Sequence, residues 1–186
     1  MHQNSDEWLQ LRRTKIGASD APIIMGVSPW KTPFQLFVEK TMGETTPMNS
    51  SMKRGRDLEY KARLEFEKAI GIPVEPQVKF HPEFDWMMAS LDGESLDGEI
   101  IVEIKCPNKK DHATAMDGRI PEKYFPQMQH QMCVCGLKQA YYFSFDGTKG
   151  CSVLVKRDDA YIKELIDEEL KFYLCMINLT PPKEEE

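Results

Sequence analysis

The chain has 186 residues and a formal net charge of −6 at pH 7, which is enough for one globular domain with a core of its own. The acidic balance argues against a protein that coats nucleic acid nonspecifically, because such proteins carry a basic excess. No segment resembles a secretory signal or a membrane span, and the five cysteines form no CxxC pair. We expect a single intracellular domain, residues 1–186, with reduced thiols, no membrane contact and an acidic C-terminal tail at about 180–186.

The first part of the chain is predicted to be helical. The predicted helices occupy residues 5–13, 19–26, 32–43 and 53–71. The first begins at good capping residues, the second and third each end on glycine, and the fourth carries apolar residues at helical spacing until a glycine and a proline stop it. A polar loop at 44–51 precedes the fourth helix.

Beyond this helix the spacing of apolar residues changes to that of strands. Strands are predicted at 74–80, 85–91 and 99–105, a helix at 121–136, a hairpin at 140–145 and 151–156, and a closing helix at 158–177. Helices before, between and after the strands indicate an α/β (α+β) fold, in which helices flank a central mixed or mainly antiparallel β-sheet.

The pentapeptide Ser-Leu-Asp-Gly-Glu occurs twice in succession between Ser90 and Glu99. Asp-Gly between two strands predicts a type I′ hairpin turn, and a turn at Asp97-Gly98 sets the register of the two strands. The pairs that then lie opposite each other are Gly93 and Val102, Asp92 and Glu103, and Ser90 and Lys105. A turn at Asp92-Gly93 instead assembles no site, so we favour the first register, which a β-bulge can shift by one residue.

This register sorts the side chains of the two strands by face. Opposed residues and residues two apart lie on the same face of a sheet. One face then carries a polar cluster of Ser90, Asp92, Glu103 and Lys105. The opposite face carries Leu91, Val102 and Ile104, which we expect to share one core.

The polar cluster indicates metal-assisted chemistry. Two facing carboxylates, Asp92 and Glu103, repel each other unless a cation lies between them, and oxygen ligands suit Mg²⁺ or Mn²⁺. Lys105 beside such a metal can orient a bound water and stabilise charge that develops on a phosphate. An isolated Glu-x-Lys is usually a solvated surface feature, so the prediction depends on the Asp and the Glu-x-Lys occurring together.

The stretches "MMASLDG" and "IIVEIKCP" resemble the core of the PD-(D/E)xK nuclease superfamily. Further motifs narrow the resemblance to the lambda exonuclease-like, or YqaJ viral recombinase, family of phage alkaline exonucleases, from about Glu7 to Phe145. Leu91 departs from the proline that the family usually has before the metal-binding aspartate. The resemblance implies a restriction-endonuclease-like core.

The stretch "EWLQLRRTKIGASDAPIIMG" resembles the N-terminal motif of this family. The resemblance implies that Arg12, Ser19 and Ser90 hold the 5′-terminal phosphate of DNA. An arginine fork and hydroxyl groups are suited to a terminal phosphate, although Arg12 taken alone would be an ordinary surface arginine.

The stretch "KRGRDLEYKARLEFE" resembles the RG-x-x-x-E helix of the family. The resemblance places Glu59 near the metals, as a ligand or through water, and makes Arg54 and Arg56 candidates for contact with the DNA backbone. Without the resemblance, Glu59 would be an exposed helix residue paired with Arg63 four positions later.

The stretch "YFPQMQHQM" resembles the glutamine-bearing helix of the family, with Gln127 at the matching position. A buried glutamine amide can hold the catalytic lysine, a metal-bound water or a DNA group. We select Gln127 as the functional residue and hold Gln131 in reserve. The roles of Gln129, His130 and Gln131 stay open, although a histidine in this setting is more often structural.

The resemblance implies a deoxyribonuclease that degrades one strand of linear double-stranded DNA in the 5′-to-3′ direction. Asp92, Glu103 and the carbonyl of Ile104 would bind one or two Mg²⁺ or Mn²⁺ ions, and Lys105 would activate the attacking water. The alternatives are a structure- or sequence-specific endonuclease on the same fold and a noncatalytic DNA-binding module.

The resemblance also implies a biological setting. Members of the family form homotrimeric rings around DNA and act on double-stranded ends that carry a 5′-phosphate. The 3′ overhangs that they leave pass to a single-strand annealing protein. We therefore expect a phage or prophage protein that functions in homologous recombination in the cytoplasm of a bacterial host.

Overall fold

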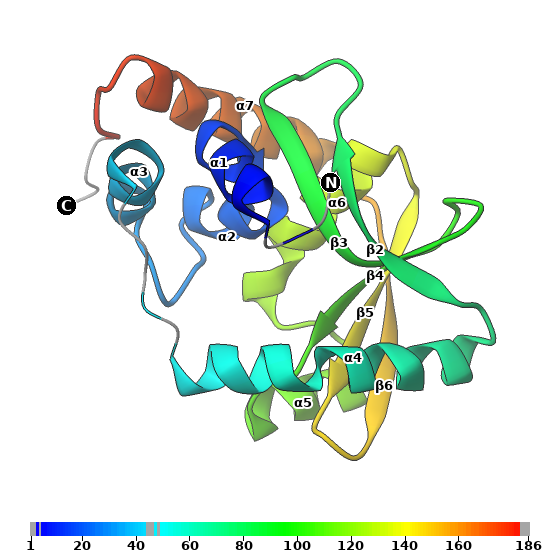
Figure 1. Ribbon diagram of the computed structural model, residues 1–186. Coiled ribbons are helices and arrows are strands. Elements are labelled where there is room, and N and C mark those ends of the chain that lie inside the picture. Colours follow the sequence, from blue (N-terminus) through cyan, green and yellow to red (C-terminus); the bar gives the residue numbers. More distant parts are fainter. Residues whose placement is uncertain (1–2, 4, 44–46, 48, 183–186) are drawn as a thin grey trace.

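The computed structural model describes residues 3, 5–43, 47 and 49–182. Residues 44–46 and 48 of the expected polar loop, and residues 183–186 of the expected acidic tail, lie outside the described residues. Figure 1 shows helices gathered on one side of a twisted sheet and one long helix, α4, crossing its other side.

The helices largely follow the sequence prediction. They are α1 (Asp6–Thr14), the 3₁₀ helix η1 (Ala18–Asp20), α2 (Ala21–Ile24), α3 (Pro33–Met42), α4 (Ser50–Ile70), α5 (Lys109–Met116), the 3₁₀ helix η2 (Glu122–Tyr124), α6 (Phe125–Cys135) and α7 (Asp159–Ile177). The side chain of Ser5 caps α1, and Thr32 with Gln35 forms a capping box on α3. Gly71 ends α4 in the left-handed conformation, with φ 79°. The short helix α5 was not predicted.

A six-stranded mixed sheet forms the centre of the fold. The strands are β1 (Ile16–Gly17), β2 (Val74–Phe80), β3 (Met87–Ser95), β4 (Ile101–Lys105), β5 (Gln139–Phe145) and β6 (Gly150–Lys156). Strands β4 and β5 are parallel, as are β1 and β3, whereas β2–β3, β3–β4 and β5–β6 are antiparallel. The predicted mixed sheet flanked by helices is therefore confirmed, and the two-residue strand β1 is an addition to it.

The predicted β3–β4 register is confirmed where the strands pair. Gly93 lies opposite Val102 and Glu94 opposite Ile101. These two pairs are the whole ladder between the strands, so the prediction that pairing continues through Asp92–Glu103 and Ser90–Lys105 was wrong. The two strands separate beyond Gly93.

The prediction of a type I′ turn at Asp97-Gly98 was also wrong. The Gly98 amide donates to the Ser95 carbonyl at 2.9 Å, and the Ser95 amide donates to the Ile100 carbonyl at 2.9 Å, so the loop contains four residues. Gly98 has φ 74°, but Asp97 does not have a positive φ, whereas a type I′ turn needs both. Asp97 instead accepts hydrogen bonds from the Ser95 hydroxyl and the Glu99 amide.

Two buried clusters lie on the two faces of the sheet. The larger contains Leu91 and residues of α3, α6 and α7. The smaller contains Val102 and Ile104, packed with Ala62 and Phe66 of α4. The expectation that Leu91 shares a core with Val102 and Ile104 was therefore wrong, because an extra residue in β3 moves Leu91 to the other face.

That extra residue is visible in the pairing of β3 with β2. Glu75 of β2 pairs with Glu94 of β3, and Gln77 pairs with Leu91. Two residues along β2 therefore correspond to three residues along β3. A β-bulge thus lies in β3 near Asp92 and Gly93, and a bulge reverses which face each following residue points to.

All five cysteines are free. Among the helices of the described ranges, none combines the length and apolar character needed to cross a lipid bilayer.

Candidate active site

The candidate site occupies a gap along one edge of β3. Glu94 pairs with both β2 and β4, and Met88 pairs with both β2 and β1. Strands β4 and β1 therefore lie along the same edge of β3, one after the other. The residues between, 89–92, pair with neither of them, so the sheet opens at the point where the predicted catalytic residues converge.

Asp92 bridges this gap with its side chain. Its Oδ2 accepts a hydrogen bond from the Ile104 amide at 2.8 Å, which connects β3 to β4 after their main-chain ladder has ended. Burial and the neighbouring charge of Glu103 raise the pKa of Asp92 well above its ordinary value, and Lys105 offsets only part of this effect. A second negative charge beside Glu103 is therefore unfavourable in this site unless a further cation is bound.

Glu103 is held by donors on two sides. Only 2% of the residue is exposed. Its Oε1 accepts hydrogen bonds from Gln127 Nε2 at 2.7 Å and from Lys105 Nζ, and its Oε2 accepts one from Gln131 Nε2. Gln127 and Gln131 are four residues apart on α6, so both amides face β4. The structure brings the chosen glutamine and the reserve glutamine to the same carboxylate.

Lys105 reaches the cleft from the end of β4. Burial alone would lower the pKa of Lys105, but the carboxylates of Glu103 and Asp92 outweigh burial and raise it. Its Nζ also lies 5.4 Å from the centre of the Tyr124 ring. Lys105 is therefore an ammonium group in direct contact with the Glu103 carboxylate, and it lies close enough to Asp92 for their charges to interact.

Arg12, Ser19 and Ser90 come together beside these residues. Arg12 Nη2 donates to Ser19 Oγ at 2.6 Å, and its guanidinium lies over the Trp8 ring at 4.9 Å. Trp8 Nε1 in turn donates to Ser90 Oγ at 2.9 Å. Trp8 thus connects the three predicted phosphate-binding residues, a role that the prediction did not assign to it.

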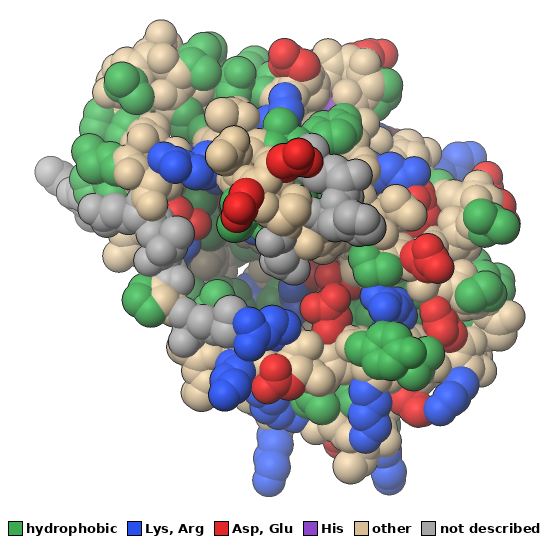
Figure 2. All heavy atoms as spheres, viewed as in Figure 1, with side chains coloured by type: hydrophobic (Ala, Val, Ile, Leu, Met, Phe, Trp, Pro, Cys, Tyr) green, Lys and Arg blue, Asp and Glu red, His purple; other side chains and the backbone are tan. Residues whose placement is uncertain are grey.

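These two groups line one cleft. Its volume is about 190 Å³, and its walls include all of the following: Arg12, Ser19, Ser90, Asp92, Glu103, Lys105 and Gln127. In Figure 2 the surface is hollowed between α4 and the region of α1 and α3, and Lys and Arg side chains lie along α4 below the hollow.

The predicted residues of α4 lie outside the lining of this cleft. Glu59 is half-buried and near enough for its charge to act on Asp92. Arg63, its expected partner, lies over the Tyr60 ring instead. Arg54 donates to the main-chain carbonyls of Cys106, Pro107 and Asp146.

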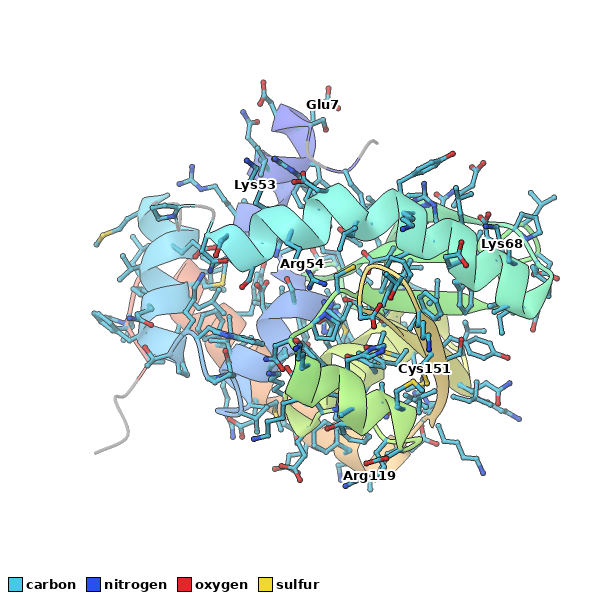
Figure 3. All side chains as sticks on the ribbon, turned by 90° about the horizontal axis from the view of Figure 1, so that it is seen from below. Glu7, Lys53, Arg54, Lys68, Arg119 and Cys151 are labelled. Carbon is cyan, nitrogen blue, oxygen red and sulfur yellow. The ribbon has the colours of Figure 1, made fainter. Side chains whose placement is uncertain are left out.

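Arg54 therefore ties α4 to the turn that follows Lys105. Figure 3 shows Lys53 and Arg54 leaving α4 on different sides. Arg56 is exposed and lies 3.9 Å from Asp57, so its side chain is open to solvent. The proposed contact of Arg54 and Arg56 with DNA stays a prediction.

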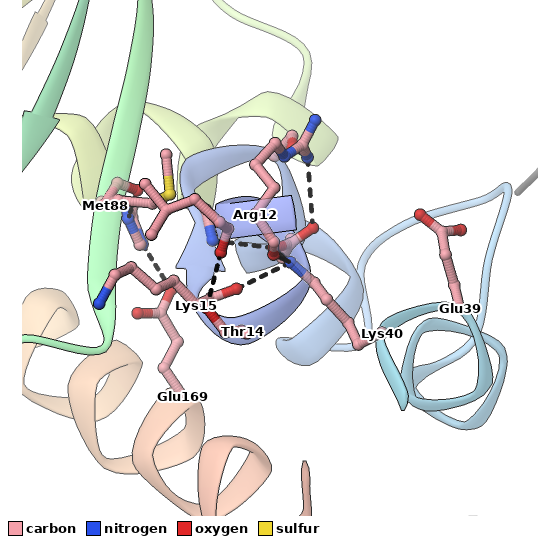
Figure 4. A network of polar contacts seen from close by, with 12 residues as sticks. Arg12, Thr14, Lys15, Glu39, Lys40, Met88 and Glu169 are labelled. Atoms are coloured by element: carbon pink, nitrogen blue, oxygen red, sulfur yellow. Dashed lines mark hydrogen bonds and ion pairs between the residues drawn. The ribbon is translucent and has the colours of Figure 1, made fainter. Parts of the chain in front are cut away.

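A buried ion pair, which the sequence analysis missed, supports the Arg12 segment. Lys40 and Asp20 are 7% and 3% exposed, and Lys40 Nζ lies 2.5 Å from Asp20 Oδ2. Lys40 also donates to the carbonyls of Arg12 and Lys15, at 2.7 and 2.8 Å (Figure 4). Lys40 follows Leu36 by four residues, so its place on the buried face of α3 was readable from helical spacing.

The remaining polar residues of α6 have structural contacts. Gln129 bonds to the carbonyl of Lys156 and the amide of Asp158. His130 is fully buried between Glu169 at 2.7 Å and the Met88 carbonyl at 2.8 Å. These contacts fix α6 against β3, β6 and α7, which holds Gln127 and Gln131 in place.

Asp92 and Glu103 are the residues that can hold a divalent cation. Within the described ranges, no three His, Cys, Asp or Glu side chains form a metal-binding group, so main-chain or water oxygens would have to complete the coordination. The donor set nevertheless fits, because Mg²⁺ typically binds through one or two carboxylates and keeps several waters. Burial and the charge of Glu103 raise the pKa of Asp92, and a bound cation would offset both effects on the Asp92 carboxylate.

The chain is similar to known proteins in sequence and in fold. Residues 7–138 match the model of the YqaJ-like viral recombinase domain family. The chain is 34% identical over 177 residues to a protein of Bacillus subtilis named uncharacterized protein YqaJ. That match covers 90% of the chain and 55% of the relative, so the chain spans about half the length of this curated relative.

Solved structures share the fold. An alkaline exonuclease from Laribacter hongkongensis, LHK-Exo, is 28% identical with a TM-score of 0.79, and the match covers 95% of this chain and 94% of that one. LHK-Exo in complex with dAMP gives 27% identity, a TM-score of 0.80 and the same coverage. A phage-related exonuclease from Haemophilus somnus, at 16% identity and a TM-score of 0.63 over 89% of this chain and 96% of that one, shares the fold alone.

Proposed function

Because the chain belongs to the YqaJ-like viral recombinase domain family, we propose that it is a metal-dependent nuclease that degrades one strand of linear double-stranded DNA from its 5′ end. The single observation that carries the proposal is the shared cleft. It joins Asp92, Glu103 and Lys105 to the Arg12–Ser19–Ser90 group. The similarity to LHK-Exo, which is described as an alkaline exonuclease, supports the activity class.

The carboxylates of the cleft would hold the metal. Asp92, Glu103 and the Ile104 carbonyl would bind one or two Mg²⁺ or Mn²⁺ ions, and Glu59 would contribute directly or through water. A bound Mg²⁺ acts as a Lewis acid on the phosphate and lowers the pKa of a bound water. Gln127 and Gln131 hold Glu103 through both of its oxygens, so the orientation of this ligand is set before the metal binds.

Lys105 would act on the water and on the phosphate. Its ammonium group can donate to the attacking water and stabilise the negative charge that develops on the phosphate oxygens. Its contacts with Glu103 and the Tyr124 ring hold the flexible side chain over the cleft. Positioning of this kind reduces the entropy lost when the reacting groups align.

The Arg12 group would set the polarity of digestion. Arg12 can present a charge-assisted fork to a 5′-terminal phosphate, and the hydroxyls of Ser19 and Ser90 add neutral donors. The contacts of Trp8 with Arg12 and with Ser90 hold the group in place. Since this pocket adjoins the carboxylates, a bound 5′-phosphate would present the next phosphodiester to them.

The assembly and setting belong to the same proposal. Three copies would form a ring around DNA, and this enclosure would compensate for the net charge of −6 that the chain carries at pH 7. The 3′ overhang would pass to a single-strand annealing protein during phage or prophage recombination in the bacterial cytoplasm.

A timed digest with Mg²⁺ tests the activity and its polarity. Linear duplexes that carry a 5′-phosphate and a label at either the 5′ or the 3′ end should lose the 5′ label first. Covalently closed circles should stay intact. Cleavage of closed circles would support the endonuclease alternative, and DNA binding without hydrolysis under any divalent metal would support the noncatalytic one.

Lys105→Ala provides the matched negative variant. It should abolish hydrolysis, while calorimetry still detects metal binding, because the carboxylates remain. Lys68→Ala is the control, since Lys68 lies exposed toward the far end of α4 (Figure 3) and should keep wild-type turnover. Wild-type turnover by the Lys105 variant would remove this lysine from the mechanism.

A further inference from the structure

An exposed tryptophan lies near the candidate active site. Trp30, in the loop between α2 and α3, is 64% exposed. The other two tryptophans, Trp8 and Trp86, are 6% and 7% exposed. A single exposed apolar residue is common on protein surfaces, but the contacts of Trp30 set it apart.

One face of Trp30 is covered by a cation. Lys123 Nζ lies 4.8 Å from the centre of the indole ring, and the Tyr124 ring lies 6.1 Å away at an interplanar angle of 31°. Lys123 is itself held by Asp111, at 2.7 Å. Most of the indole nevertheless stays open to solvent, because these contacts leave 64% of the residue exposed.

The loop that carries Trp30 is anchored on both sides. The Trp30 amide donates to Ser28 Oγ at 3.3 Å. Lys31 pairs with Glu39 on α3, and Thr32 caps that helix. The indole is therefore presented by a held segment, which reduces the entropy cost of binding a ligand on it.

Trp30 is connected to the catalytic lysine through Tyr124. The Tyr124 ring lies 5.3 Å from Lys123 Nζ and 5.4 Å from Lys105 Nζ, and it stacks on the buried Tyr142. Aromatic rings and ammonium groups thus alternate from Lys105 through Tyr124 and Lys123 to Trp30. This row begins at the site of the proposed hydrolysis and ends at an open indole face.

The chemistry of this row suits unpaired nucleic acid. Proteins that bind single strands combine positive charge for the backbone with aromatic rings on which bases stack. We propose that Trp30 stacks an unpaired nucleobase of the DNA substrate beside the active site, an inference that rests on the proposed nuclease function. Lys123 stabilises the stack from behind, and the base must leave the duplex to reach the indole.

A metal-free titration tests this proposal without requiring turnover. The full chain is titrated in EDTA with a blunt duplex and with the same duplex carrying a 3′ single-stranded overhang. Trp30→Ala should weaken binding of the overhang duplex between about 5-fold and 150-fold, the range for losing one stacked base. Binding of the blunt duplex should change less than threefold.

Two further variants separate stacking from structural damage. Trp30→Phe should recover most of the affinity of the overhang duplex and lose most of the fluorescence quenching that this DNA causes in wild type. Leu154→Ala, which removes a 44% exposed side chain on β6, should match wild type in affinity and quenching. Equal binding of the overhang duplex by wild type and Trp30→Ala would overturn the proposal and leave the indole for a protein partner.

The proposed function fails in a different way. Wild-type protein that neither binds nor hydrolyses any of these DNAs with Mg²⁺ or Mn²⁺ overturns the nuclease. Wild-type protein that hydrolyses linear DNA, with no effect of Trp30→Ala on the overhang duplex, overturns only the stacking site.

Discussion

Replacing Lys40 with methionine removes an ammonium group from the protein interior while keeping a side chain of similar length. The wild-type Nζ pairs with Asp20 and donates to the carbonyls of Arg12 and Lys15. The variant loses all three contacts. Asp20, which is 3% exposed, keeps only the Gly17 amide at 2.8 Å and the more distant Arg12 at 3.7 Å.

The expected loss of stability follows from the buried Asp20 carboxylate, which has lost its ion-pair partner. Breaking a buried ion pair by removing one partner costs about 3–5 kcal/mol. Because Arg12 stays near Asp20, we expect the lower end, about 3 kcal/mol, which corresponds to a fall in melting temperature of roughly 6–12 °C for a chain of this size. Lys171→Met is the control, since its exposed pair with Glu168 should contribute less than about 1 kcal/mol.

The pH dependence distinguishes this cause from a packing defect. Burial opposes the charge on Asp20, but Lys40 and Arg12 outweigh it and lower the Asp20 pKa below its ordinary value of 3.8. This stabilisation is present above the unfolded pKa and disappears as the pH falls through the folded one. Without Lys40, burial should raise the Asp20 pKa. Protonation of Asp20 in acid then removes the buried charge and reduces the stability lost by the variant.

Thermal unfolding followed by circular dichroism between pH 7 and pH 4 measures both effects. The difference between wild type and Lys40→Met should narrow as the pH falls. A penalty below about 1 kcal/mol at pH 7, far under the cost of a broken buried pair, would refute the reasoning. A large penalty that stays constant with pH would show that lost packing, and not the charge of Asp20, is the cause.

Three further predictions concern the cleft and its strands. Asp92→Asn should abolish hydrolysis. Asp97→Asn should keep it, because an asparagine oxygen can still accept the hydrogen bonds from Ser95 and Glu99. Equal loss of hydrolysis in both variants would contradict the assignment of Asp92, and not Asp97, to the active site. Arg12→Ala should erase the preference for 5′-phosphorylated over 5′-hydroxyl ends in a competition digest, with Arg13→Ala as the exposed control. Gly93→Ala would place a methyl group 2.6 Å from Val74 and 2.8 Å from Val102. Denaturant unfolding should therefore show that the free energy of unfolding falls by about 1–3 kcal/mol. Gly55→Ala is the control and should show no such loss, because Gly55 has open space around it.

Local patterns were sufficient to predict the register of the β3–β4 hairpin. An alternating strand, a turn and a second strand lie within twenty residues, and the pairing of Gly93 with Val102 follows from their spacing. The turn type depended on a side chain instead. Ser95 Oγ accepts from the Ile100 amide and donates to Asp97, and this arrangement stabilises a longer loop than the Asp-Gly dipeptide favours.

The opening of the sheet could not be predicted in the same way. It depends on β1, which has only two residues, Ile16 and Gly17, and therefore shows no strand period. Its partners, Met87 and Met88, lie about 70 residues later in the chain. A pairing this short and this distant has no local signal, so neither the gap in the sheet nor the cleft was visible from the sequence.

The two copies of Ser-Leu-Asp-Gly-Glu show why composition alone does not assign a catalytic residue. In the second copy, Asp97 bonds within its own loop, and Gly98 supplies the positive φ that the loop needs. In the first copy, Gly93 lies against Val74 and Val102, where its missing side chain makes room for the bulge. That bulge, together with the separation of β3 from β4, turns the Asp92 carboxylate toward Ile104. The neighbouring strands therefore decide which aspartate reaches the cleft, and substitutions at Val74 or Val102 should move Asp92 without touching it.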